Sequence, residues 1–314
     1  MSKTSERKVT IVVPVYADWP SLKDCIESLK QYVGAEHKVI LVNDCGPEAD
    51  ELEKKIKKAI DGTENFEYYR NKRNMGFLKT CNRAVLEIDR TQNDVLLLNS
   101  DTKVTEGFLE ELMSVLASSN KIGAVSPRTN NATIATIPLS AMRQKGINPK
   151  KSYKMFLKKK IKMPRYVEVP TAHGFCILLR RNLINKYGLF DEIFGKGYGE
   201  EVDFCMRIRK HGYKSVLSNR SYVFHLEAKS FTPEAKIPLL KASSEIINSR
   251  YPEYSKLVGD YERRALALEE GIDPEKGLVY SGGLKGNLRK LIERNKKVHS
   301  LVKKINAQVR QKGE

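Results

Sequence analysis

Four points in the sequence place polar side chains at the ends of apolar runs. They are Asp44, Asp101, the pair Glu200–Glu201, and His225. Carboxylates and an imidazole can bind a divalent metal ion or accept a proton, so a site that needs both would use these residue types. Taken singly, each is more often structural: Asp44 a turn residue, the glutamates part of a first helical turn, His225 the end of a strand. Their order along one chain favours a shared site.

The segment Asn99-Ser100-Asp101 follows a run of four apolar residues that begins at Val95. Such a run is typical of a strand buried on both faces. Open α/β sheets bind ligands at the carboxyl ends of their strands, and the oxygen groups of these three residues suit Mg²⁺ or Mn²⁺ beside a diphosphate. The alternative is that Asp101 caps a helix over residues 102–116.

The other three points suit complementary roles. Asp44 ends a second strand-like run, so it should lie on the same sheet edge as Asp101, where its carboxylate suits a uracil or a ribose hydroxyl. Glu200 and Glu201 open a predicted helix, whose dipole favours carboxylates and whose first turn offers a general base. His225 suits a metal ligand or a contact to a diphosphate.

The elements that must position these residues alternate between strands and helices. Apolar runs predict the strands, and apolar stripes at helical spacing fill the intervals between them. This alternation implies right-handed crossovers and an α/β fold with a doubly wound, mostly parallel sheet over about residues 8–128. The predicted strands are Val9–Val15, Lys38–Asn43, Phe66–Arg70, Asp94–Leu98, 122–126, Tyr166–Val169, 174–180, 214–217 and 222–224.

Two basic stretches depart from this alternation. Residues 128–165 show no clear strand rhythm, which predicts a functional loop that is mobile without ligand and borders the acceptor, or else a solvated charged insertion. Residues 232–314 are predicted to be helical and basic. Within them, aliphatic residues recur at helical spacing over 284–309 among lysines and arginines. That pattern is typical of a helix on an anionic membrane surface, the alternative being a stripe packed on the protein or on a second subunit.

Composition bounds the class of protein. A chain of 314 residues with 40% hydrophobic residues can bury a core in one or two domains. The net charge of +18 implies an anionic partner: a nucleotide, a nucleic acid or a membrane surface. The five cysteines lack CxxC spacing, which predicts reduced core thiols. Without a signal-peptide pattern or a membrane span, we expect a cytoplasmic protein, soluble or peripheral at the inner face of the plasma membrane.

Taken together and in order, the motifs resemble those of the family 2 inverting glycosyltransferases with the GT-A fold, of the bacterial polysaccharide and glycoconjugate type. The resemblance covers about residues 8–230. The pieces that carry it are IVVPVY at 11–16, VND at 42–44, NMGF at 74–77, LLLNSDT at 96–102, GFC at 174–176, GLFD at 188–191, GYGEEVDF at 197–204, His225, and SF at 230–231.

The resemblance implies a domain plan and an activity. Residues 1–231 would form the GT-A domain, with a nucleotide-sugar half over about 8–128 and an acceptor half over about 166–231. A helical basic extension would follow over 232–314. The implied activity is a metal-dependent hexosyl transfer from a nucleotide-sugar, a UDP-sugar first among them, to a hydroxyl of a glycan, a lipid-linked sugar or a glycoprotein.

The resemblance also assigns roles residue by residue. Asp101 and His225 would bind Mn²⁺ or Mg²⁺, and Glu201 would be the base that takes the acceptor proton. The nucleotide-sugar would contact Pro14, Tyr16, Asp44, Asn74, Gly76, Asn99 and Ser100. A carboxylate base and one displacement at the anomeric carbon invert that centre, with no second carboxylate nucleophile.

Two positions depart from the family pattern. Asn99 stands where the first carboxylate of the DXD motif is usual, and the usual Glu-Asp pair is Glu200–Glu201. Glu200 and Asp203 therefore remain candidates for the base beside Glu201.

Other classes of protein fit the sequence less well. A nicotinamide or flavin enzyme needs a glycine-rich turn after its first strand, and residues 14–18 contain no glycine. A nucleotidyltransferase-like enzyme shares the sheet and the metal chemistry, yet usually carries a glycine-rich basic loop at the same place. The net charge alone favours a nucleic-acid-binding protein, but the chain has no recognisable zinc finger or aromatic RNA-reading motif, so we expect no nucleic acid partner.

Overall fold

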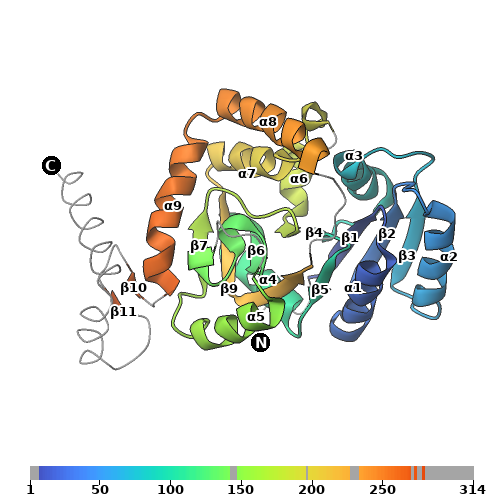
Figure 1. The fold of residues 1–314 in the computed structure, drawn as a ribbon, viewed down its shortest axis with the longest axis horizontal. Coiled ribbons are helices and arrows are strands. Elements are labelled where there is room, and N and C mark those ends of the chain that lie inside the picture. The colour runs from blue at the N-terminus through green and yellow to red at the C-terminus, as the bar shows by residue number, and fades with distance from the viewer. Residues whose placement is uncertain are drawn as a thin grey trace.

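The computed structural model describes residues 7–141, 147–195, 197–226, 233–269, 272–273 and 278–279. These residues form a nine-stranded mixed sheet covered by helices (Figure 1). The strands are hydrogen-bonded in the order β3-β2-β1-β4-β8-β6-β9-β5, and β7 also pairs with β9. The predicted α/β class is confirmed.

The first half of the chain supplies the parallel part of the sheet. Figure 1 shows β1, β2 and β3 with α1 and α2 at one end of the molecule. The elements are β1 (Val9–Val15), α1 (Trp19–Tyr32), β2 (Lys38–Asn43), α2 (Ala49–Ile60), β3 (Phe66–Arg70), α3 (Phe77–Asn82), the π-helix η1 (Arg83–Ile88), β4 (Asp94–Leu98), β5 (Thr102–Val104), α4 (Phe108–Ala117) and β6 (Ile122–Arg128).

The second half completes the sheet and covers it. In Figure 1, α7 and α8 run along one side of the molecule and α9 lies beside β7 and β9. The elements are the 3₁₀ turns η2 (Thr133–Ala135) and η3 (Leu139–Ala141), α5 (Pro149–Lys159), β7 (Tyr166–Val169), β8 (Cys176–Leu179), α6 (Arg181–Tyr187), η4 (Glu192–Phe194), α7 (Glu200–Lys210), β9 (Lys214–His225), α8 (Pro233–Arg250), α9 (Tyr254–Glu269), β10 (Ile272–Asp273) and β11 (Leu278–Val279).

Alternate residues of the central strands enter two apolar cores. Ile11 and Leu96 lie in the core shared with α1, α2 and α4. Val12 and Leu97 lie in the core shared with α3, α6 and α7. Because successive side chains of a strand point to opposite faces, strands buried on both faces read as continuous apolar runs, which is why these strands were predictable.

The sheet differs from the predicted parallel order at its centre. β8 pairs antiparallel with β4 and with β6, so it lies between two strands of the first half. β5 is a strand paired antiparallel with β9, and α4 begins only at Phe108. The alternative in which Asp101 caps a helix over residues 102–116 is therefore wrong. Residues 8–128 and 166–225 share one sheet.

Residues 128–165 are more regular than predicted. α5 occupies residues 149–159, with Asn148 accepting a hydrogen bond from the backbone of Lys151 as its N-cap. The aromatic rings of Tyr153 and Phe156 pack on Tyr222 at centroid distances of 5.0 and 4.9 Å. The irregular-loop interpretation is wrong for this helix, because a single face with two aromatic residues was hidden among lysines.

The helical character predicted from residue 232 onward is confirmed for residues 233–269 as α8 and α9. The stripe predicted over residues 284–309 lies outside the described residues. Among the described helices, none combines the length and the apolar character needed to cross a lipid bilayer. Four of the five free cysteines are buried, as expected of core thiols.

Candidate active site

The pairing of β5 with β9 brings together Asp101 and His225, which are 124 positions apart in the chain. Thr102 lies opposite His225 in the ladder, and the backbone carbonyl of Asp101 accepts a hydrogen bond from Leu226 N at 2.8 Å. His225 Nε2 lies 3.5 Å from Asp101 Oδ1. The two residues predicted as metal ligands therefore lie side by side.

Two asparagines that sequence reasoning missed fix the orientation of His225. Asn130 brackets its backbone, accepting from His225 N at 2.9 Å and donating to His225 O at 2.8 Å. His225 Nδ1 lies 2.6 Å from the carbonyl oxygen of Asn131. Because a carbonyl only accepts hydrogen bonds, Nδ1 carries a proton, and Nε2 is the ring nitrogen that faces Asp101 and that could bind a metal ion.

This pair fits a divalent ion that is shared with a substrate. Among the described residues, no group of three or more His, Cys, Asp or Glu side chains gathers closely enough to hold a metal ion by itself. A carboxylate oxygen and an imidazole lone pair facing one another at 3.5 Å would repel unless a proton or a cation lies between them. Mg²⁺-type sites use one or two carboxylates and complete their shell with phosphate oxygens and water.

The segment 173–175 connects this pair to the acidic pair on α7. The backbone of Asn99 donates to Phe175 O at 2.9 Å, and the Phe175 ring stacks on His225 at a centroid distance of 5.1 Å. Next to it, Gly174 packs against Glu201: a Cβ at Gly174 would lie 3.4 Å from the Glu201 carboxyl carbon. Asn99 and Ser100 are half-buried beside this segment.

Glu200 and Glu201 open α7 in different surroundings. Glu200 is 5% exposed, and its Oε2 has no hydrogen-bond partner among the described residues. Burial raises the pKa of Glu200 to about 8, with the neighbouring Glu201 as the second cause. Burial also raises the pKa of Glu201, but the backbone amides of Gly174, Val202 and Gly199 oppose the shift. As a residue, Glu201 is half-buried, whereas Glu200 is buried.

Asp203 is fully buried and neutralised by arginines. Its Oδ2 accepts from Arg207 Nε at 2.7 Å, and its Oδ1 accepts from Arg250 Nη1 at 2.9 Å and from the Tyr251 hydroxyl at 2.8 Å. Arg250 also donates to Asp191 Oδ2 at 2.8 Å. This network ties α7 to the end of α8.

Asp44 organises the loop that contains the predicted Asn74 and Gly76. Its Oδ1 accepts from Asn71 Nδ2 at 2.7 Å and from Met75 N at 2.8 Å, and its Oδ2 accepts from Gly76 N at 2.8 Å. Gly76 has a φ of 84°, a conformation that glycine adopts at little cost. Asn74 Oδ1 accepts from the same Gly76 N at 3.0 Å and is exposed.

Pro14 and Tyr16 lie at the carboxyl end of β1. Pro14 is opposite Val42 of β2, and the pairing of β1 with β4 ends at Val12, so the missing N–H of Pro14 interrupts no bond to β4. The half-buried Tyr16 approaches Gly46 closely, since a Cβ at Gly46 would lie 1.8 Å from the Tyr16 carbonyl oxygen.

His173 also lies beside the Asp101–His225 pair and was not predicted. Its ring packs edge-on to Phe175 at a centroid distance of 5.6 Å, and its Nδ1 accepts from Phe175 N at 3.3 Å. Burial lowers the pKa of His173 to about 3, with His225 as the second cause. Asn130, Asn131 and His173 lie outside every predicted strand and helix, so nothing in the pattern pointed to them.

Comparisons with known proteins identify the family of the chain. Residues 10–188 match the model of the family described as glycosyl transferase family 2. An uncharacterized protein of Mycobacterium bovis is 26% identical over 137 residues, which are 43% of this chain and 47% of that protein. Uncharacterized proteins of two Mycobacterium tuberculosis strains match to the same extent. The chain thus spans about half the length of the curated relatives it matches.

Solved structures share the fold at low sequence identity. GalNAc-T7, crystallised with UDP, GalNAc and Mn²⁺, has a TM-score of 0.61 and 16% identity, over 92% of this chain and 54% of that chain. The mannosyltransferase PcManGT from Pyrobaculum calidifontis, in complex with GDP-Man and Mn²⁺, has a TM-score of 0.58 and 15% identity, over 85% and 74% of the two chains. TarS 1–349 of S. aureus, in complex with UDP-GlcNAc, has a TM-score of 0.53 and 15% identity, over 84% and 72%.

Proposed function

Since the chain belongs to glycosyl transferase family 2, we propose that it transfers a sugar from a nucleotide-diphospho-sugar to a hydroxyl acceptor, with inversion and with the help of a divalent metal ion. The observation that carries the proposal is the approach of His225 Nε2 to Asp101 Oδ1 at 3.5 Å, beside a segment that packs on Glu201. Metal ligands and a base then border the same space.

Asp101 and His225 are the residues that would hold Mn²⁺ or Mg²⁺, and the Asn131 carbonyl keeps the Nε2 lone pair available. The ion would stabilise the charge that develops on the leaving diphosphate. Asn99 replaces the first DXD carboxylate, so the protein supplies one acidic ligand here and the diphosphate supplies the rest. The GalNAc-T7 and PcManGT structures contain Mn²⁺, which favours Mn²⁺ over Mg²⁺.

Glu201 is the proposed general base. Asp203 is unsuited, because two arginines and a tyrosine hydroxyl already satisfy its carboxylate. Glu200 is less suited, because it is 5% exposed, whereas Glu201 is half-buried beside Gly174. Glu201 remains, and its raised pKa makes it a stronger proton acceptor than an exposed glutamate once it is ionised.

In the proposed reaction the acceptor oxygen attacks the anomeric carbon while Glu201 takes the hydroxyl proton. The bond from that carbon to the diphosphate oxygen breaks, and its electron pair leaves with the nucleoside diphosphate. His173 lines the segment next to Glu201 as a neutral ring, so it cannot compete as a charged acid near pH 7. One displacement inverts the anomeric centre.

The nucleoside would lie against Pro14, Tyr16 and the loop that Asp44 organises. Three N–H groups of residues 71–76 donate hydrogen bonds to the Asp44 carboxylate. Asp44 would therefore have two roles: it fixes the loop with Asn74 and Gly76, and it accepts a hydrogen bond from the ribose or the base. UDP-sugars are the first donors to test, since GalNAc-T7 and TarS were solved with UDP or UDP-GlcNAc, and GDP-Man is the second.

For the acceptor we propose a hydroxyl of a glycan, a lipid-linked sugar or a glycoprotein, as in polysaccharide assembly. Ile193 of η4, in the segment that precedes α7, is 54% exposed, and Ile237 of α8 is 64% exposed. Exposed apolar side chains at these positions would suit an acceptor with an apolar portion. The five free cysteines suit a reducing, cytoplasmic location.

A panel of nucleotide-sugars, with and without Mn²⁺, tests the proposal. A bound donor should raise the unfolding temperature by mass action only when Mn²⁺ is present, and the same donor should then release nucleoside diphosphate in an acceptor screen. If Mn²⁺ alone changes the unfolding temperature and no nucleotide-sugar of the panel changes it further, the donor assignment is wrong.

A further inference from the structure

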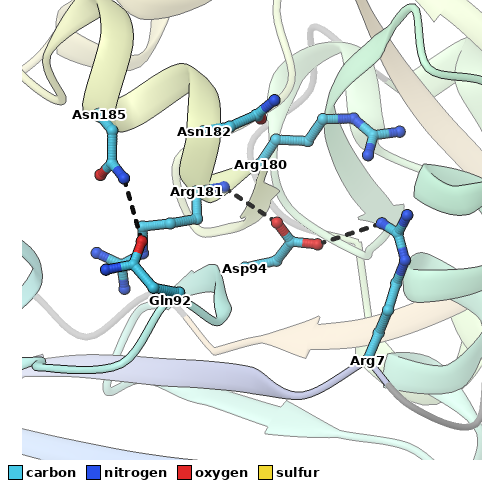
Figure 2. Close-up of a pocket in the computed structure, with 7 residues that line it drawn as sticks. All are labelled: Arg7, Gln92, Asp94, Arg180, Arg181, Asn182 and Asn185. Carbon is cyan, nitrogen blue, oxygen red and sulfur yellow. Dashed lines mark hydrogen bonds and ion pairs between the residues drawn. The ribbon is translucent and has the colours of Figure 1, made fainter.

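A hollow of about 270 Å³ lies at the edge of the sheet opposite the candidate active site (Figure 2). β1 and β4 both begin at this edge, with Val9 opposite Asp94. The antiparallel β8 ends here, with Leu179 opposite Val95. The strand ends therefore bring Arg7, from before β1, to Arg180, from after β8, and to Asp94 between them. We call this hollow the arginine pocket.

Arg181 also lines the arginine pocket, but its guanidinium group is already paired with groups inside the protein. Its Nη2 pairs with the buried Asp89, its Nε donates to Asn93 O at 2.9 Å, and its Nη1 donates to Val85 O at 3.0 Å. Asp94 accepts from the backbone of Arg181 at 3.0 Å through Oδ1. Arg181 is therefore structural, and the net charge of the pocket depends on Arg7, Arg180 and Asp94.

Arg7 and Arg180 keep donors unused. Arg180 is 7% exposed. Its Nη2 donates to backbone carbonyls at the end of α4 and in the turn that follows, and its Nε donates to the carbonyl of Ile122 at the start of β6. Its Nη1 has no acceptor in the part of the chain that the structure describes. Arg7 Nη1 lies 3.6 Å from Asp94 Oδ2, beyond hydrogen-bonding distance. Asp94 is the one carboxylate among the residues that line the pocket, against the guanidinium groups of Arg7 and Arg180, which leaves an excess of positive charge.

The two guanidinium groups also lie near each other. Figure 2 shows both on the same side of Asp94, with Arg180 reaching in from the start of α6 and Arg7 from the strand edge. Burial lowers the pKa of Arg180; Asp94 opposes this shift and the charge of Arg7 adds to it. Like charges held together with unused donors are stabilised by an anion that neutralises them.

We propose that the arginine pocket binds a small phosphate-type oxyanion between Arg7 and Nη1 of Arg180, with the side-chain amide of Asn182 as a neutral donor. Its volume of about 270 Å³ lies just below the roughly 300–1,000 Å³ of ordinary small-molecule sites, and it is ample for a single phosphate group. The group is either free phosphate or the phosphomonoester of a lipid headgroup. The pocket lies at the far edge of the sheet from Asp101, so this site is separate from the proposed transferase site.

Titration calorimetry of the full chain with inorganic phosphate, without nucleotide or metal, tests the site. Arg7→Gln is the variant of choice, because the Arg7 side chain is 41% exposed and the protein should fold without it, whereas Arg180 holds the end of α4. Arg220→Gln, at an exposed position of β9, removes the same charge elsewhere. Wild type and Arg220→Gln should bind phosphate at one saturable site, and Arg7→Gln should bind about tenfold more weakly or worse.

Vesicles separate the two sources of the phosphate group. Phosphatidylcholine vesicles with phosphatidic acid, compared with phosphatidylcholine alone, should capture wild type and not Arg7→Gln if a lipid headgroup is the ligand. Arg7-dependent binding of inorganic phosphate without capture on vesicles identifies the free ion. Equal phosphate affinity of wild type and Arg7→Gln, or no saturable phosphate binding by wild type, overturns the proposal. Neither result bears on nucleotide-sugar turnover.

Discussion

Replacing Arg250 with methionine tests whether the end of α8 holds the helix that carries the proposed base. The change removes two hydrogen bonds and keeps most of the apolar stem. The bond to Asp191 is minor, about 0–1 kcal/mol, because that carboxylate is 40% exposed. The bond to Asp203 is larger, about 1.5–3 kcal/mol, because it joins a charge to a fully buried carboxylate. Arg250→Met should therefore lower the free energy of unfolding by about 2–3 kcal/mol.

A matched arginine on the next helix provides the control. Arg263 pairs with Asp260 on α9, where the side chains are 51% and 33% exposed, so Arg263→Met should cost about 0–1 kcal/mol. Urea unfolding of both variants against wild type measures the difference. Equal losses in the two variants would refute the claim that Asp203 depends on Arg250.

The same variant should separate transfer from donor binding. Loss of Arg250 loosens the first turn of α7 and leaves the Asp44 loop intact, so kcat should fall while the donor dissociation constant stays the same. Arg250→Lys keeps one charged donor and should recover part of kcat. A parallel loss of donor affinity would contradict a role confined to positioning α7.

Three further predictions concern the acidic pair and the nucleoside side. Glu201→Gln keeps the shape of the side chain and should lower turnover by about two to four orders of magnitude, with donor binding retained. An inactive Glu200→Gln variant together with an active Glu201→Gln variant would reverse the assignment of the base. Glu200 binds its proton more tightly in the folded chain, because burial raises its pKa from the ordinary 4.5 to about 8. The stabilising effect of this proton is complete below pH 4.5 and is lost as the pH rises through about 8. Urea unfolding at about pH 6 and pH 9 should therefore show a smaller loss of stability with pH for Glu200→Gln than for wild type. Gly46→Ala forces the Tyr16 backbone away from a Cβ that would lie 1.8 Å from its oxygen, so it should destabilise the chain by about 1–3 kcal/mol and weaken nucleotide binding, while Gly259→Ala, whose nearest neighbour is a side-chain atom at 3.5 Å, should be tolerated in both assays.

The fold was predictable where local patterns and burial agree. β1 and β2 were predicted to the residue, because both are apolar runs buried on both faces. The insertion of β8 between β4 and β6 was not predictable, since strand order depends on pairings between distant residues that no local pattern encodes. α5 was missed because its two aromatic residues lie among lysines, whose polarity dominates the composition of residues 149–159.

The site was predictable in its residue types and only partly in its contacts. The resemblance to family 2 glycosyltransferases is confirmed, and the two predicted metal ligands meet through the β5–β9 pairing, although β5 itself was not predicted. Asn130 and Asn131 lie in an irregular stretch, so their hold on His225 could be seen only in three dimensions. The three carboxylates of α7 could not be told apart by sequence, because one of the two arginines that pair with Asp203 comes from position 250.

The most direct test of the central claim is the binding of nucleoside diphosphate to wild type and to Asp101→Ala, each titrated with and without Mn²⁺. Asp101 supplies the acidic ligand of the proposed metal site, and His225 stands 3.5 Å from it. We predict that Mn²⁺ strengthens binding to wild type by at least about tenfold, and that this gain disappears in Asp101→Ala. An unchanged Mn²⁺ dependence in Asp101→Ala would contradict the assignment of the Asp101–His225 pair as the metal site.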